Sequence, residues 1–382
     1  MKEQKIFADG YNVTFAQEDD FINFLFDRKE NAQWSIFKTK TIRFLALDDK
    51  ISSANKFAKN YSNEEKEELI LDTMENTRLL IKAKDEYYPV RDCAVKTILE
   101  RARISGNALN KVEKPVLARI LNHCMKVTSG DALLRLSEGK ISAVHGGDRT
   151  DYAVLEIPEL FSKTVEYLQE NFPQSEFAGG YYDHSLVTAL WAFPKQSRLL
   201  KAYQEALDDR GIESDELEAS LRLSTSDVGI SGANLYPMLF VGPNKKNITL
   251  GAPLKLEHKN GADIKKFEKN LTMIYAQYGN ALKKLTALLD IDIRYPINTM
   301  AGVMKRIGVP KKLAFEAIEI FKMQHGTSDC TAHDLYYGIS EVIFCMQCNG
   351  ADGSRIASME ENIARALSIR WSDYDIGGEL KW

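Results

Sequence analysis

The sequence predicts an α+β protein with a central, mainly antiparallel sheet, a helical N-terminal region and a C-terminal helical bundle. Capped amphipathic segments fill the first part of the chain, short segments with strand character fill the middle, and a helical period dominates the last part. We therefore expect an N-terminal strand and helical region at 1–128, a sheet region at 129–262 and a helical region at 263–382. No linker, repeat or low-complexity segment separates these regions, so lobes of one unit are as plausible as independent domains.

The N-terminal region holds both expected types of element. A helix is expected from Asp19 to Lys29 and a strand, partly buried on both faces, from Trp34 to Leu47. Ser62 and Glu65 have the spacing of a capping box, and the glutamates that follow favour a helix N-terminus. Two further helices are expected at Val90–Ser105 and Pro115–Met125.

The middle region changes to the period of strands. A hairpin is expected from Ala132 to Val144, with its turn at Ser137–Lys140. A helix is expected from Glu159 to Asn171. The remaining strand candidates are Tyr152–Ile157, Leu186–Phe193, Leu221–Ser226, Leu235–Val241 and Ile248–Leu256.

The strongest period in the chain begins at Asp263. Apolar residues from Ile264 to Leu289 recur at steps of three and four, which is typical of a seam between packed helices. Three more helices are expected, at Pro310–Met323, Ala332–Cys348 and Arg355–Trp371.

Composition limits the class of protein. Hydrophobic residues make up 44% of 382 residues and charged residues 27%, which is ordinary for a folded globular chain. The longest apolar run, Leu235–Val241, is far shorter than the roughly 20 residues needed to cross a bilayer. We therefore expect a cytoplasmic protein without a membrane contact, and its five cysteines do not suggest a disulfide framework.

Common signatures of nucleotide-dependent and hydrolytic enzymes are absent. The chain has no phosphate-binding Gly-x-x-x-x-Gly-Lys-Ser/Thr loop, no dinucleotide fingerprint, no His-Glu-x-x-His pair and no Gly-x-Ser-x-Gly elbow. We predict no cofactor, and the sequence favours a non-catalytic protein, although an enzyme built from dispersed residues stays open.

Two groups of residues are candidate metal ligands. Cys345 and Cys348 have zinc-like spacing, but they lie within an amphipathic helix, where a free cysteine is usually a small apolar residue. His145, Asp148, Asp183 and His184 could form a site only by meeting across strands. We predict no metal at the cysteines and keep the second group as a nuclease-like alternative.

Lysine gathers in one segment of this acidic chain. Between Lys245 and Lys269 there are seven lysines and three acids, whereas the whole chain has a net charge of −4. Interleaved aromatic and amide residues could let this segment neutralise phosphates and stack bases. The predicted nucleic-acid contacts are Lys245, Lys246, Lys255, Lys259, Lys265 and Lys266; a solvated surface is the alternative.

A loop of small polar residues runs from Ser224 to Asn234. Such a loop can present backbone N–H groups to an anion, or it can be a tight connection between strands. We add Ser226 and Asn234 to the predicted contacts.

Three segments resemble a known family. They are the Ser224–Asp227 loop, the helix from Thr331 to Glu341 with the later Glu360–Leu367, and Tyr87–Val90 with the helix that follows. Together they make the chain similar to the phage/plasmid-like proteins of domain of unknown function 932, over roughly Tyr87–Trp371, although Val228 stands where the family has glycine. The resemblance implies a mobile-element setting and brings no catalytic residues.

These observations lead to three hypotheses of function. The first is a non-catalytic accessory protein that binds single-stranded or duplex DNA during recombination, single-strand annealing or replication, as a homo-oligomer. The second is an interaction or assembly factor of a phage acting on a host system, with the Ile264–Leu289 seam or an exposed aromatic surface as its contact. The third is a metal-dependent nuclease.

Overall fold

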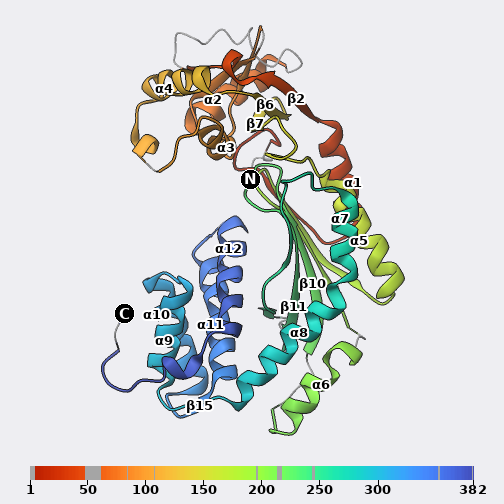
Figure 1. Ribbon diagram of the computed structural model, residues 1–382, viewed down its shortest axis with the longest axis vertical. Coiled ribbons are helices and arrows are strands. Elements are labelled where there is room, and N and C mark those ends of the chain that lie inside the picture. Colours follow the sequence, from red (N-terminus) through yellow and green to blue (C-terminus); the bar gives the residue numbers. More distant parts are fainter. Residues whose placement is uncertain are drawn as a thin grey trace.

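The protein is a mixed α+β structure, as the sequence predicts. We describe it from a computed structural model, which covers residues 5–47, 62–83, 85–106, 108–194, 197–212, 217–242, 246–351, 353–380 and 382. A small lobe lies at one end, a large antiparallel sheet lies in the middle, and a helical bundle packs against one face of that sheet (Figure 1).

In the residues that the structure describes, the small lobe has two three-stranded sheets and three α-helices around their own core. One sheet has the order β2-β6-β7 and the other β3-β4-β5, and all of these pairs are antiparallel. The core includes Ile81, Val90 and Met125. Its elements are β2 (Ala32–Lys38), η1 (Thr39–Thr41), β3 (Arg43–Ala46), α2 (Asn63–Glu75), β4 (Leu79–Ala83), β5 (Glu86–Pro89), α3 (Ala94–Arg101), η3 (Ala108–Lys111), α4 (Lys114–Val127), β6 (Asp131–Ser137) and β7 (Lys140–Gly146).

The central sheet has seven strands. Its order is β1-β8-β9-β10-β11-β12, and β13 pairs with the other end of β11. These strands are β1 (Asn12–Phe15), β8 (Glu176–Asp183), β9 (Val187–Phe193), β10 (Leu217–Thr225), β11 (Ala233–Val241), β12 (Lys246–Thr249) and β13 (Leu254–Leu256).

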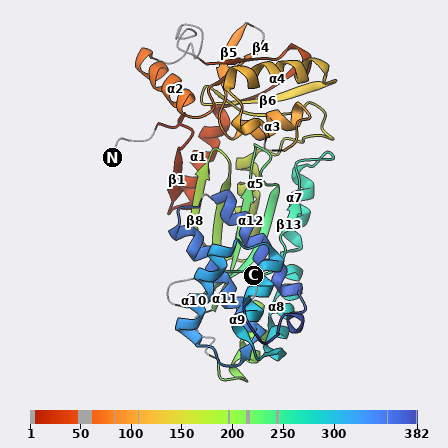
Figure 2. The ribbon, with the colours of Figure 1, turned by 90° about the vertical axis from the view of Figure 1, so that its left-hand side faces the viewer.

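Helices cover both faces of this sheet (Figure 1). On one side lie α1 (Glu18–Glu30), α5 (Ile157–Asn171), α6 (Ser197–Asp208), α7 (Ile264–Thr272) and α8 (Ile274–Ala287). The bundle lies on the other side and stands in front of the sheet in Figure 2. It contains η4 (Leu288–Asp290), β14 (Asp292–Ile293), α9 (Pro296–Ile307), α10 (Lys311–His325), β15 (Cys330–Thr331), α11 (Ala332–Cys348), α12 (Gly353–Ala364), η5 (Arg365–Ser368) and η6 (Trp371–Asp373).

Several predicted elements are confirmed. The helices expected from Asp19, Ser62, Pro115, Glu159 and Ala332 exist, and Ser62 and Glu65 form the complete capping box. The hairpin of β6 and β7 also exists. It pairs with β2 rather than with the central sheet, so the boundary expected at residue 129 falls inside the small lobe.

Other predictions are wrong, and tertiary contacts explain why. The strand expected at Trp34–Leu47 is two strands in different sheets, because the η1 turn intervenes and Thr39 is buried there against Arg101. No strand forms at Tyr152–Ile157, where the Tyr152 ring stacks between two histidines. Ile248–Leu256 is likewise divided between β12 and β13.

The seam from Ile264 to Leu289 is helical and mostly buried, but it runs along α7 and α8 and ends in η4. These helices pack against the sheet on the side opposite the bundle (Figure 1). The period identifies a buried helix face correctly and does not identify what covers it. No helix in the described ranges is long and apolar enough to cross a bilayer.

Candidate functional site

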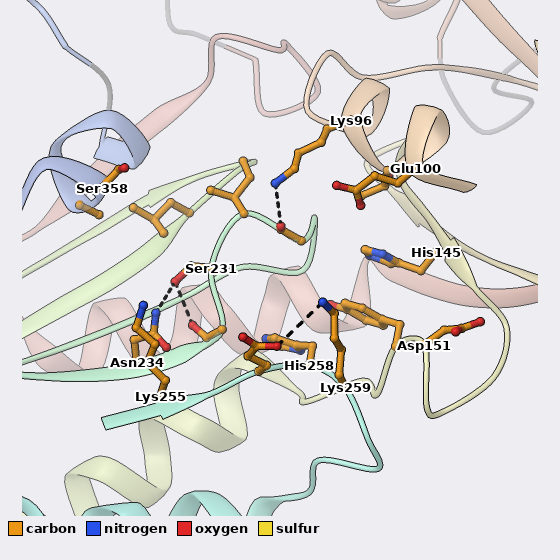
Figure 3. A pocket seen from close by; sticks show the side chains of 18 of the residues that line it. Lys96, Glu100, His145, Asp151, Ser231, Asn234, Lys255, His258, Lys259 and Ser358 are labelled. Atoms are coloured by element: carbon orange, nitrogen blue, oxygen red, sulfur yellow. Dashed lines mark hydrogen bonds and ion pairs between the residues drawn. The ribbon is translucent and has the colours of Figure 1, made fainter. Parts of the chain in front are cut away.

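A polar cleft lies where the small lobe, the central sheet and α12 meet. Its volume is about 840 Å³. The α3 and β7 side forms one wall, the loop Gly229–Gly232 with β11 and β13 forms the floor, and α12 forms the opposite wall (Figure 3). Three parts of the sequence that are far apart therefore contribute to one site.

Positive charge exceeds negative charge along this cleft. The cationic lining residues are Lys96, Arg101, Arg103, Lys255, Lys259 and Arg365. The acidic lining residues are Glu100, Asp151, Glu257 and Glu361. Six cations against four carboxylates leave an excess of two, which favours an anionic ligand over a cationic one.

Some of these cations are already neutralised or bonded. Lys255 Nζ lies 2.5 Å from Glu361 Oε2, and Lys259 Nζ lies 3.9 Å from Glu257 Oε2. Lys96 Nζ donates to the carbonyl of Gly229 at 3.1 Å. Arg103 and Arg365 are exposed and form no side-chain hydrogen bond or ion pair with any residue that the structure describes. Their charges remain available to a ligand.

Glycine is required in the loop at the floor of the cleft. Gly229 has φ of +72°, and a Cβ there would lie 3.4 Å from His145 Cε1. A Cβ on Gly232 would lie 2.5 Å from the carbonyl oxygen of Leu256. The loop therefore packs its backbone closely against β7 and the end of β13.

Asn234 lies at the floor of the cleft and is only partly hydrogen-bonded. Its Nδ2 donates to Ser231 Oγ at 3.0 Å and to Tyr236 Oη at 3.4 Å, but its Oδ1 is buried without a hydrogen-bond partner. The residue is 5% exposed and lines the cleft. An unsatisfied buried oxygen costs about 1–3 kcal/mol, and this oxygen is buried from solvent, so a ligand in the cleft would reach it only if the side chain turned.

Stacked rings support the cleft from behind. The His145 and Tyr152 rings are 3.6 Å apart with an angle of 5° between their planes, and the Tyr152 and His258 rings are 5.2 Å apart with an angle of 8°. The carbonyl oxygen of Asp227 accepts from His145 Nε2 at 2.9 Å and from Tyr152 Oη at 3.2 Å. Burial lowers the pKa of His145 to about 4 and also lowers the pKa of His258. Both rings are therefore neutral near pH 7.

Buried polar contacts hold α12 against the sheet. Arg222 forms an ion pair with Glu360, and its guanidinium lies 4.4 Å from the centre of the Tyr236 ring. Tyr236 Oη donates to Glu361 Oε1 at 2.7 Å. Arg222 and Tyr236 are cross-strand partners on one sheet face, so β10 and β11 jointly fix the α12 wall.

The structure divides the predicted contact residues. Lys255, Lys259 and Asn234 line the cleft. Lys246 instead forms an ion pair with Glu341 at 2.5 Å, and Lys265 and Lys266 lie exposed on α7 outside the cleft lining. Lys245 lies outside the described residues.

Ser226 has a structural position. It is 1% exposed, and its Oγ accepts from the backbone N–H groups of Val228 and Ile230. Its contacts shape the loop from within, and the residue is not part of the cleft lining.

The predicted stacking of bases on nearby aromatic rings is not available. Tyr236, Phe240 and Phe267 are 1%, 4% and 0% exposed. A base could reach their faces only if the core opened, because all three rings pack inside the protein.

The candidate metal ligands are not gathered into one site. His145 bonds Asp227, Asp148 accepts from Thr150, Asp183 caps the turn at Ser185 and Leu186, and His184 bonds the carbonyl of Ala8. Cys345 is buried in α11, as expected of a small apolar residue, and Cys348 is exposed. Across the described ranges, no three histidine, cysteine or acidic side chains are placed to hold a metal ion.

Four cationic residues that line the cleft were not predicted from the sequence, namely Lys96, Arg101, Arg103 and Arg365. A local signal existed for three of them, because Lys96, Arg101 and Arg103 lie within eight consecutive residues of the chain. Nothing local connects that segment with Arg365. Their proximity depends on how the small lobe sits over α12.

Comparison with protein-family models, curated proteins and solved structures finds no match to this chain. The resemblance to phage and plasmid proteins therefore stays a prediction.

Proposed function

We propose that this protein binds single-stranded nucleic acid, with single-stranded DNA as the first ligand to test, in the cleft between the small lobe and α12. The main support for the proposal is that Arg103 and Arg365 line the same polar cleft and have no ion-pair partner among the described residues. Phosphate groups of one strand would neutralise them and release counterions. The proposal involves no chemical step on the nucleic acid.

The size of the cleft favours a single strand. Its volume of about 840 Å³ is comparable to pockets that enclose a small organic ligand, roughly 300–1,000 Å³. A short stretch of one strand fits such a space, whereas a duplex does not. Asn234 is one of the polar side chains that line this space.

Phosphate contacts should dominate the affinity. The aromatic rings that line the cleft, on His145, Tyr152, Tyr236 and His258, are all at most 8% exposed. Stacking, which gives many single-strand binders much of their affinity, is therefore limited. We expect weak sequence preference and a strong dependence on salt concentration.

The test compares two pairs of substitutions of equal charge. Arg103→Asn with Arg365→Gln removes the two free cations of the cleft, and asparagine tolerates the φ of 57° at position 103. Lys265→Gln with Lys266→Gln removes two exposed cations of α7, outside the cleft. Binding of labelled oligo(dT) is measured by anisotropy over a series of salt concentrations.

We expect the cleft pair to weaken binding about tenfold, or about 1.4 kcal/mol. The slope of log K against log salt should become shallower by about 1.4, because each lost phosphate contact to a single strand contributes about 0.7. The α7 pair should bind as the parent does. If the α7 pair weakens binding and the cleft pair does not, the cleft is the wrong site.

The setting in a mobile element, and a part in recombination or replication, are what the resemblance implies for such an activity. The interaction hypothesis loses one of its two predicted contacts, because the Ile264–Leu289 seam packs in the core. Its other predicted contact, an exposed aromatic surface, stays a prediction. The nuclease hypothesis loses its predicted ligand cluster among the described residues.

A further inference from the structure

A second cationic cavity lies on the small lobe. Its volume is about 510 Å³, and its lining consists of Lys40, Thr41, Arg43, Lys82 and Lys126. These residues come from η1, β3, β4 and the last turn of α4. Four of the five carry a positive charge and none carries a negative one, in a chain whose net charge is −4.

The four charges are not neutralised by the rest of the described protein. None of these side chains forms an ion pair with a described residue. Arg43 Nη1 donates only to the carbonyl oxygens of Lys40 and Ile42, at 2.6 and 2.8 Å, and Lys82 Nζ lies 5.6 Å from the centre of the Tyr87 ring. These contacts position the cations and leave their charge intact.

The strand register adds to the repulsion. Arg43 and Lys82 are direct cross-strand partners of β3 and β4, so two like charges face each other on one side of the sheet. Like charges directly opposite are destabilising. A polyanion bound across this surface would attract both cations and offset their mutual repulsion. This is the physical reason to expect an anionic ligand here.

One arginine connects this cavity with the cleft. Arg101 lines the cleft, and its guanidinium donates to Thr39 Oγ1 from Nε at 3.1 Å and from Nη2 at 2.6 Å. Thr39 is the first residue of η1, and the next two residues, Lys40 and Thr41, line the second cavity. The two cationic sites therefore share the short η1 turn as a border.

We infer that a single strand leaving the cleft continues across η1 and places its phosphates over Lys40, Arg43, Lys82 and Lys126. This inference rests on the proposed function, because it extends the path of the same ligand. It narrows the ligand class to an extended single strand and excludes a free nucleotide as the full ligand. Affinity should accordingly rise with strand length until both sites are occupied.

The test uses the full chain and two lengths of oligo(dT), roughly 4 and 15 nucleotides, which bracket common single-strand site sizes. Lys40→Gln, Arg43→Gln and Lys82→Gln together remove three charges of the second cavity. A matched control removes three exposed α7 charges with Lys265→Gln, Lys266→Gln and Lys269→Gln. Circular dichroism establishes that both variants are folded.

We expect the parent to bind the long strand at least tenfold more tightly per site than the short one. The second-cavity variant should lose most of that advantage and bind the short strand unchanged, and the control should match the parent for both lengths. The inference is overturned if the second-cavity variant keeps the parent's affinity for the long strand. It is also overturned if polyglutamate of similar length, and not DNA, responds to the substitutions, because the surface would then fit an acidic protein segment.

Failure of the proposed function has a different signature. In that case the Arg103→Asn, Arg365→Gln variant binds both lengths as tightly as the parent, whatever the second-cavity variant does. If the second-cavity variant binds the long strand as tightly as the parent and the cleft variant does not, the cleft is a binding site and the second cavity is not.

Discussion

Two groups of charged side chains on the small lobe differ in how they are neutralised. In the first group, Lys140 is fully buried, and its Nζ contacts Asp9 Oδ1 at 2.7 Å and Asp72 Oδ2. Arg91 adds a contact to Asp9 at 3.4 Å. The second group, Lys96 and Arg103 at the cleft, lies exposed, and neither residue has an ion-pair partner among the described residues.

The difference separates charges that hold the protein together from charges that can meet a ligand. A buried cation needs a carboxylate within the protein, because an unpaired charge is very costly away from water. An exposed cation has no such need and can contact phosphate when a ligand arrives. Lys140 ties the N-terminal segment to β7 and α2, whereas Lys96 and Arg103 stabilise nothing comparable.

The largest expected effect breaks the buried group. Lys140→Met should lower the free energy of unfolding by about 3–5 kcal/mol, because Asp9 would lose its main partner at 4% side-chain exposure. Lys126→Met, an exposed change on the same lobe, should cost less than about 0.5 kcal/mol. Urea denaturation measures both. Equal losses would show that the two groups do not differ as described.

A second effect tests the neutral rings behind the cleft. The pKa of His145 in the folded protein is about 4, because burial disfavours its charged form, whereas an unfolded histidine has a pKa of about 6.5. The unfolded chain therefore binds more protons below about pH 6.5. Stability should fall as the pH falls from about 6.5 towards 4.

The free energy of unfolding of the parent should fall between pH 7 and pH 5, and in His145→Phe this fall should be smaller by about 2 kcal/mol. Urea denaturation at the two pH values measures this difference, and it separates the pH dependence from any constant loss of packing. His123→Gln, which changes an exposed histidine of the same lobe, is measured in parallel for comparison. An unchanged pH dependence in His145→Phe would mean that His145 is not held neutral.

Local sequence patterns predicted where helices and strands form better than they predicted which elements pack against one another. The period from Ile264 to Leu289 marks a truly buried face, yet it could not show that a sheet rather than a bundle covers it. The strand after Trp34 was recognisable, but its division depends on Arg101, which lies about 60 residues later and bonds Thr39. Tyr152 has strand character and stacks between histidines instead.

The site was only partly predictable for the same reason. Lys255, Lys259 and Asn234 lie in the segment where charge and small polar residues gather, and the structure places them in the cleft. Lys246 has similar sequence surroundings but meets Glu341, which lies 95 residues away. Charge counting cannot separate these lysines, because neutralisation is decided by neighbours that are distant in sequence.

The smallest effect concerns the contacts that hold the α12 wall. These contacts are less buried than those of Lys140 and more buried than Lys96 and Arg103. Tyr236→Phe should lower the free energy of unfolding by about 1 kcal/mol, because it removes the hydrogen bond to Glu361 and the longer one from Asn234 and leaves Lys255 in place. Tyr337→Phe, which removes one hydroxyl contact to Tyr203, is a matched change elsewhere. If Tyr236→Phe lowered the free energy of unfolding by more than about 3 kcal/mol, the α12 contacts would be as important for stability as those of Lys140.

The most direct test of the cleft as a binding site is the protection of individual lysines by DNA. The unmodified protein is labelled with an amine-reactive ester, with and without saturating oligo(dT), and each lysine is quantified by mass spectrometry. We predict that DNA protects Lys96, Lys255 and Lys259, and that Lys265 and Lys269 on α7 react equally in both samples. Protection confined to α7, or no protection at the three cleft lysines, would contradict the account.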